Sequence, residues 1–159
     1  MSCAPATATE RLFAGANVGF GPDADRLGVH ADFPLLDRPL REGRRWTVSI
    51  EGGISYWDSS RPGPHQRAWQ LSGVPFVRLH NRRGLYVELG IGASVFTERT
   101  LGTQELGSSF QFCDHLGAGV EWDGARHRLG LRLSHFSNGR IADPNDGLDL
   151  WQIAYTRRF

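Results

Sequence analysis

The residues with the clearest chemical potential are a histidine, a serine and an aspartate near the C-terminus. His135 and Ser137 lie two residues apart in "RLSHFSNG", and Asp149 follows the turn-like stretch "NGRIADPNDG". An imidazole, a hydroxyl and a carboxylate are the parts of a nucleophilic triad, in which the imidazole takes the proton of the hydroxyl and the carboxylate orients the imidazole. The three residues predict this chemistry if the fold brings them onto one face.

The residues around this motif alternate with period two, which is typical of β-strands. In "HRLGLRLSHFS", the apolar positions Leu129, Leu131 and Leu133 continue by twos to His135 and Ser137. Residues two apart in a strand share a face. The histidine and the serine are therefore expected on the apolar face of their strand.

The acid is expected on the same face of the next strand, because Asp149 continues the alternation of Trp151 and Ile153. If His135 pairs with Asp149 across an antiparallel hairpin, their Cβ atoms lie about 5 Å apart, and Ser137 falls opposite Gly147. His135 is then flanked by the serine along its own strand and by the carboxylate across it.

The same alternation recurs along the chain and predicts a single all-β domain spanning residues 1–159. The clearest example is "LYVELGIGASVF", in which every second residue is apolar. Most of the segments are separated by turn-forming residues. The predicted strands are 11–21, 26–34, 45–57, 67–79, 84–96, 108–122, 126–137 and 147–159. Their number and length predict an eight-stranded antiparallel β-barrel.

Two kinds of barrel fit this pattern: a soluble barrel that binds an apolar ligand inside, and an outer-membrane barrel with its apolar face toward lipid. The non-apolar face favours the outer-membrane barrel, because it combines many small residues with charges that could pair in a narrow lumen. The apolar face also carries aromatic residues near strand ends, as expected at lipid interfaces, and the chain ends in Phe159. The charged and polar positions are Glu51, Gln70, Arg78, Glu88, His115, Glu121 and Arg132; the aromatic ones are Trp46, Trp69, Trp122, Trp151 and Tyr155. We predict an eight-stranded antiparallel transmembrane β-barrel.

Composition limits the kinds of partner and cofactor that we expect. The net charge of +1 gives no reason to expect nucleic acid, and Cys3 and Cys113 have no metal-binding or disulfide spacing. We expect no metal and no cofactor. The N-terminus "MSCAPATATE" is not an intact signal peptide, so for an exported protein we expect that the signal has been removed and Met1 added.

Loop lengths orient the barrel. The long loops 58–66, 97–107 and 138–146 are expected outside, and the short turns 81–84 and 123–126 on the periplasmic side. The connection 35–44 breaks this asymmetry. The histidine, the serine and the acid then lie on the lipid-facing surface near the outer leaflet. Polar groups in such a place are costly and tend to mark function.

The stretch "SHFSNGRIADPNDGLDLWQIAY" resembles the C-terminal motif of the PagL family of outer-membrane lipid A 3-O-deacylases. The resemblance implies that Ser137 is the nucleophile, His135 the general base and Asp149 the orienting acid, where the family pattern has glutamate. It also implies that Asn138 and Asn145 position the loop or the oxyanion. The backbone N–H of Gly139 is a further candidate oxyanion donor.

The implied function is that of a serine esterase which hydrolyses the ester-linked 3-hydroxyacyl chain at position 3 of lipid A in the bacterial outer membrane. The expected partners are lipid A or lipopolysaccharide and membrane lipid, and a homodimer is left open. A non-enzymatic barrel, adhesive or structural, is the alternative. The sequence leaves Cys113 and Asp114 unexplained. The alternation places Asp114 on the lipid-facing side of its strand, which indicates a bulge, a slip in the alternation or a contact with another protein.

Overall fold

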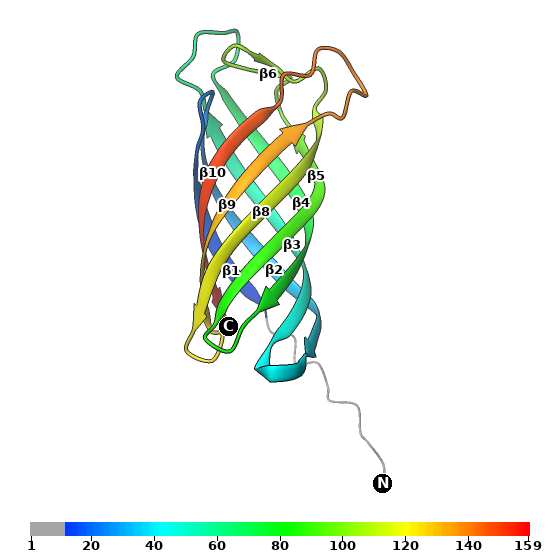
Figure 1. Cartoon of the computed structure of the whole chain (residues 1–159). Helices are drawn as coiled ribbons and strands as arrows, with labels where there is room; N and C mark the ends of the chain where they lie inside the picture. Colours follow the sequence, from blue (N-terminus) through cyan, green and yellow to red (C-terminus); the bar gives the residue numbers. More distant parts are fainter. Residues whose placement is uncertain (1–11) are drawn as a thin grey trace.

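The structure, a computed structural model, describes residues 12–159 as a closed antiparallel β-barrel of eight strands (Figure 1). The barrel strands are β1 (Phe13–Phe20), β2 (Asp25–Pro39), β3 (Arg45–Asp58), β4 (Arg67–His80), β5 (Leu85–Phe96), β8 (Phe110–Trp122), β9 (His127–Ser137) and β10 (Leu148–Arg158). Each strand pairs with its neighbours along the chain, and β1 pairs with β10 from Phe13↔Arg158 to Phe20↔Trp151. The expectations for the N-terminal signal and for Cys3 concern residues 1–11, which lie outside the described residues.

Alternation sorts the side chains of each strand between lumen and exterior. Leu89, Ile91 and Leu131 point outward and are 52%, 58% and 49% exposed, whereas Glu88 and Arg132 point inward and are each 2% exposed. A barrel with leucines outside and charges inside is inverted relative to a soluble protein. The prediction of a membrane barrel is therefore confirmed, and the soluble barrel with an apolar interior is excluded.

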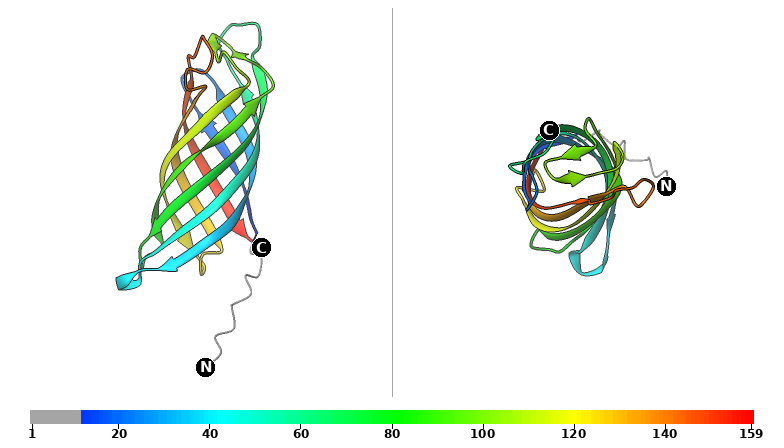
Figure 2. Two further views of the ribbon diagram at one scale, coloured as in Figure 1. Left: turned by 90° about the vertical axis from the view of Figure 1, so that its right-hand side faces the viewer. Right: turned by 90° about the horizontal axis from the view of Figure 1, so that it is seen from above.

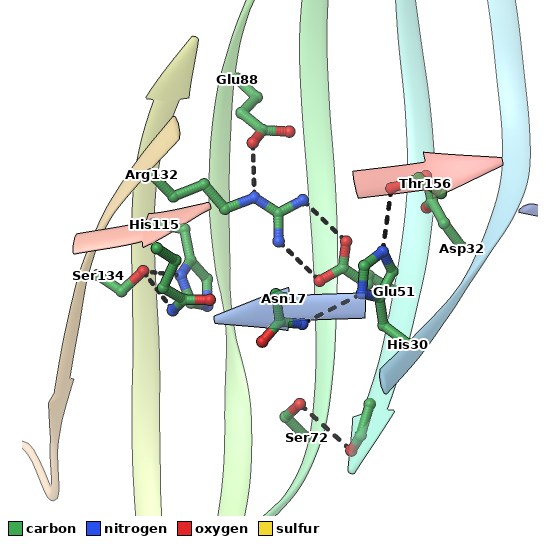
Figure 3. Close-up of polar contacts among 12 residues, drawn as sticks. Asn17, His30, Asp32, Glu51, Ser72, Glu88, His115, Arg132, Ser134 and Thr156 are labelled. Carbon is green, nitrogen blue, oxygen red and sulfur yellow. Dashed lines mark hydrogen bonds and ion pairs between the residues drawn. The ribbon is translucent and has the colours of Figure 1, made fainter. Parts of the chain in front are cut away.

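Ion pairs neutralise the charges in the lumen. Arg132 donates from Nη1 and Nη2 to the two carboxylate oxygens of Glu51, both at 2.8 Å, and from Nε to Glu88 at 2.6 Å (Figure 3). Arg78 donates from Nε to the other oxygen of Glu88 at 2.8 Å. Both guanidinium groups lie over the ring of Phe76, with Cζ atoms 4.8 and 4.4 Å from its centroid. Four strands are thus joined across the interior by paired charges.

The lumen is apolar toward one end of the barrel, where an aromatic cluster fills it. The ring of Trp57 packs edge-on against Phe136, with centroids 5.2 Å apart, and contacts Phe96 at 5.4 Å. Leu101 and Leu106, which come from the loop that follows β5, are fully buried in the same core cluster. This end, which we call the loop end, carries the connections 59–66, 97–109 and 138–147. The other end, the turn end, carries the short turns 81–84 and 123–126.

The connection 35–44, expected to be a long loop, is largely strand. β2 continues to Pro39 and pairs with β3 as far as Arg45, so the two strands form a hairpin that projects beyond the barrel wall (Figure 2). Proline usually argues against a strand because it cannot donate a ladder hydrogen bond. Here Pro34 lies at a bulge, and β1 pairs with β2 only as far as Asp32. Beyond Asp32, the edge of β2 that faces away from β3 has no neighbouring strand, so no backbone N–H is required there.

The loop 97–107 contains a small hairpin that the sequence pattern did not reveal. β6 (Thr100–Leu101) and β7 (Gln104–Glu105) pair with each other and lie over the mouth of the barrel (Figure 2). A short 3-10 turn, η1 (Arg41–Gly43), closes the β2–β3 hairpin. No helix among residues 12–159 is long and apolar enough to span a membrane.

We predict that Arg132→Met strongly destabilises the barrel. The substitution leaves the carboxylates of Glu51 and Glu88 buried without their principal partner, and breaking such a pair costs about 3–5 kcal/mol. Urea titration in detergent or lipid should show a lower unfolding midpoint than for the wild type. Arg126→Met is the matched control, because that arginine is exposed at the turn end and has only a 3.9 Å contact with Asp123. Equal midpoints for the two variants would contradict this account of the lumen.

Candidate active site

The hairpin of β9 and β10 brings His135 and Asp149 into contact. The two residues are directly paired across the strands, in the register expected from the sequence. Nδ1 of His135 lies 2.7 Å from Oδ1 of Asp149. An ionised carboxylate only accepts, so Nδ1 carries the proton and donates it, and Nε2 remains as the basic nitrogen. A histidine with this tautomer can accept a proton from a neighbouring hydroxyl.

Both side chains point to the exterior of the barrel. The side chain of His135 is 46% exposed and that of Asp149 is 67% exposed. Their neighbours along the strands, Leu133 and Trp151, are exposed apolar residues of the lipid-facing surface. The pair therefore lies in a largely apolar surface.

Ser137 is the last residue of β9 and lies on the same face as His135, two residues nearer the loop end. It is half-buried and is paired with Phe112 of β8. Within the described part of the chain, the hydroxyl makes no hydrogen bond with the imidazole. Hydrogen bonds between catalytic groups are often long before substrate binds. The structure thus joins the histidine to the acid and leaves the serine beside them.

The loop 138–147, which follows the serine, is held by two asparagines. The backbone N–H of Asn138 donates to Oδ1 of Asn145 at 2.8 Å. The side-chain amide of Asn138 is fully buried and donates to the carbonyls of Leu106 and Ala142, each at 2.8 Å. The Asn138 amide therefore faces the inside of the loop rather than the outer surface, and both asparagines are placed to fix the loop's shape.

Two glycines next to the candidate residues have backbone angles that favour glycine. Gly139 has φ of +64° and Gly147 has φ of +73°, a region that other residues adopt only with strain. A Cβ atom on Gly147 would also lie 3.2 Å from Cε1 of His135. Gly139 is exposed beside Ser137, so its N–H belongs to the segment that borders the hydroxyl.

The β6–β7 hairpin anchors this loop from across the barrel mouth, a role that sequence reasoning missed. The backbone N–H of Glu105 donates to Oδ2 of Asp146 at 2.8 Å, and the N–H of Asp146 donates to the carbonyl of Glu105 at 3.2 Å. The sequence shows a glycine at position 107, and in the structure Gly107 has φ of +69° and lies against the carbonyl of Pro144. A glycine in a loop can indicate that another segment approaches closely, but the sequence does not show which segment that is.

A second acid lies beside the histidine, on the opposite side from Asp149. Asp114 of β8 is directly paired with His135 of β9 and points outward. The burial of β8 alternates without interruption from Gln111 to His115, so neither a bulge nor a slip in the alternation explains it. Within residues 12–159, no cluster of His, Cys, Asp or Glu side chains is arranged to hold a metal ion.

Comparison with known proteins places the chain in one family. The model of the family described as "Lipid A 3-O-deacylase (PagL)" matches residues 25–158. The lipid A deacylase PagL of Bordetella bronchiseptica is 39% identical over 145 residues, covering 89% of this chain and 80% of that protein. The lipid A deacylase PagL of Pseudomonas aeruginosa is 31% identical over 132 residues, covering 82% and 75%.

Solved structures agree. The crystal structure of the outer membrane enzyme PagL superposes with a TM-score of 0.81 at 25% identity, covering 91% of this chain and 98% of that chain. The Yersinia pestis outer membrane protein Ail has a TM-score of 0.56 at 10% identity and shares the fold alone. The matched family model spans most of the chain, including the two strands that carry His135 and Asp149. The chain belongs to the PagL family of lipid A 3-O-deacylases.

Proposed function

We propose that this protein is a serine esterase of the bacterial outer membrane that removes the ester-linked acyl chain at position 3 of lipid A. The observation that carries the proposal is the 2.7 Å hydrogen bond between His135 and Asp149 on the outer face of the barrel, beside Ser137. Polar groups on a lipid-facing surface are costly, and a non-enzymatic barrel gives no reason for a histidine–carboxylate pair there. Membership of the PagL family supports the same function.

The proposed reaction begins with the hydroxyl of Ser137. Nε2 of His135 removes its proton while Oγ attacks the ester carbonyl, and Asp149 stabilises the imidazolium that forms. The tetrahedral intermediate then collapses, the sugar oxygen leaves with the proton from His135, and an acyl-enzyme remains. Water, deprotonated by the same histidine, attacks the acyl-enzyme and releases the fatty acid and the free serine.

The oxyanion of the tetrahedral intermediate needs donors near Ser137. The backbone N–H of Gly139 is our candidate, because it follows the serine by two residues in a loop of fixed shape. Asn138 and Asn145 act on this step by holding the loop, since both are engaged in hydrogen bonds within it. Preorganised donors of this kind contribute on the order of 10²–10³-fold to rate.

The site also suits the location of lipid A. We propose that the loop end faces outward and the turn end faces the periplasm, since long loops outside and short turns inside are usual in such barrels. The candidate triad then lies in the outer leaflet, just below the loops. The apolar residues around it, Leu133 and Trp151, contact the acyl chains of the substrate and of neighbouring lipids.

We predict that Ser137→Ala lowers deacylation on the order of 10³-fold or more, because the hydroxyl that attacks the ester is lost. His135→Ala should be similarly damaging, and the double variant little worse than either single one, since members of a triad act as a unit. Mass spectrometry of lipid A should show the loss of one 3-hydroxyacyl chain with the wild type and not with these three variants. Ser60→Ala, an exposed serine of another loop at the same end, should retain full activity. An active Ser137→Ala would overturn the mechanism.

The acid gives a second prediction. Asp149→Asn should reduce the rate markedly, because an amide can donate to His135 and favour the wrong tautomer. Asp149→Glu should retain much of the activity, since it restores the residue usual in the family at the cost of one methylene of space. Initial rates on lipid A in detergent micelles test both variants. Asp25→Asn is the control, because Asp25 is an exposed acid at the start of β2, at the loop end of the barrel. Wild-type rates in Asp149→Asn would show that this carboxylate does not act on the histidine.

A third prediction concerns the loop. Asn138→Ala should lower kcat while the barrel stays folded, because the carbonyls of Leu106 and Ala142 lose their donor and the loop loosens. Faster proteolysis within 138–147 should accompany the lower rate. Asn81→Ala is the matched control: Asn81 accepts hydrogen bonds from the backbone of a tight turn at the turn end, so its loss should affect stability but not turnover. Unchanged kcat and proteolysis in Asn138→Ala would remove the loop from the mechanism.

A further inference from the structure

The two ends of the barrel carry opposite charge. The turn end has nine arginines and three acidic residues, which lie within 35–45, 81–84, 123–126 and 157–159. The loop end has seven acidic residues and four arginines, which lie within 21–25, 58–67, 97–109 and 138–147. The whole chain has a net charge of only +1, so the fold has separated charges that nearly cancel in the composition.

Most of the turn-end arginines are not neutralised by the protein. Each of the three acidic residues at this end already lies within ion-pair distance of an arginine, Glu42 of Arg44, Asp37 of Arg45 and Asp123 of Arg126. The other six arginines form no ion pair with another residue of 12–159; they are Arg38, Arg41, Arg82, Arg83, Arg157 and Arg158. The turn end therefore presents an excess of positive charge to its surroundings.

Two of these six arginines lie on the outer face of the barrel, beside aromatic residues. Arg38 is directly paired with Trp46 on the outward side of the β2–β3 hairpin. Arg157 is directly paired with His127, whose ring stacks on that of Trp122 with centroids 5.3 Å apart. Tryptophan is enriched at the level of the lipid headgroups. Both guanidinium groups are therefore at the depth at which the phosphate groups of a bilayer lie.

The β2–β3 hairpin adds apolar surface to this basic end. It projects beyond the barrel wall (Figure 2), and Phe33, Leu35 and Leu40 on it are 51%, 62% and 44% exposed. A surface that combines apolar and basic side chains suits the boundary between headgroups and acyl chains of an anionic membrane. A soluble acidic partner would match the arginines but would not account for the apolar residues and tryptophans beside them.

We propose that the turn end binds the phosphate groups of anionic glycerophospholipids in the leaflet that surrounds it. In the orientation proposed above, this is the inner leaflet of the outer membrane. The planar guanidinium group can donate two parallel hydrogen bonds to one phosphate, and an anionic leaflet attracts basic side chains at its surface. Because the loop end is acidic, this attraction acts on one end of the barrel alone.

The test measures which lipid lies beside the turn-end tryptophans. The full-length protein carrying Trp69→Phe and Trp151→Phe, both exposed tryptophans near the loop end, is folded into phosphatidylcholine vesicles. Its fluorescence then reports on Trp46 and Trp122 at the surface, since Trp57 is buried in the lumen. Brominated phosphatidylglycerol or brominated phosphatidylcholine is added as a quencher. We expect phosphatidylglycerol to be preferred about fivefold or more, the equivalent of at least one arginine at an anionic surface, and less so at high salt.

Two pairs of substitutions locate the preference. Arg38→Gln with Arg157→Gln should lose most of it, whereas Arg99→Gln with Arg140→Gln, two exposed arginines of the loop end, should keep it. Quenching by brominated phosphatidylcholine should be the same in all variants, which shows that each barrel is folded and inserted.

Three outcomes would overturn the proposal. Equal quenching of the unmutated turn end by the two lipids would show that it does not select anionic headgroups. A preference that survives Arg38→Gln with Arg157→Gln would show that these arginines do not bind them. Weak quenching by both lipids would show that a second copy of the chain covers this surface instead. The vesicles contain no lipid A, so none of these results depends on the deacylase function.

Discussion

The closure of β1 onto β10 is the constraint on which the rest of the structure depends. Inside a bilayer no water is available to the peptide groups, so every N–H and C=O of a spanning strand must bond to another strand. A ring of paired strands satisfies this condition without an open edge. Once the ring is closed, each strand has one face toward lipid and one toward the lumen, and the sequence must alternate accordingly. The outward leucines and the inward Arg132 with its two glutamates follow from this single condition.

The same alternation builds the candidate site at little structural cost. An even spacing along β9 places His135 and Ser137 on one face, and the antiparallel register adds Asp149 and Asp114 from the two adjacent strands. Side chains on strands are positioned more precisely than side chains on loops, so the barrel holds these polar groups in fixed positions. Phe136, between the two residues of β9, points inward and packs against Trp57. The residues of one strand thus serve the site and the core in turn.

The sequence was sufficient to predict the eight barrel strands and the pairing of His135 with Asp149, because both follow from period-two alternation in consecutive antiparallel strands. The sequence was insufficient for features that depend on contacts between residues far apart in the chain. The extension of β2 was missed because Pro34 and Pro39 argue against a strand, and only the unpaired edge beside them explains why they are tolerated. The β6–β7 hairpin is too short to show a period, and its attachment to Asp146 joins residues far apart in the chain.

The outward direction of His135 and Asp149 also decides how a molecule can reach them. An enzyme with a pocket receives its substrate from solution, and a lid or a channel controls entry. Here the pair lies on the barrel wall, so the lipid substrate of the proposed reaction would arrive by lateral diffusion within its leaflet. The relevant concentration is then the mole fraction of the lipid in the surface rather than its amount per volume of water. Anything that crowds or orders the surrounding lipids slows encounter without touching the protein.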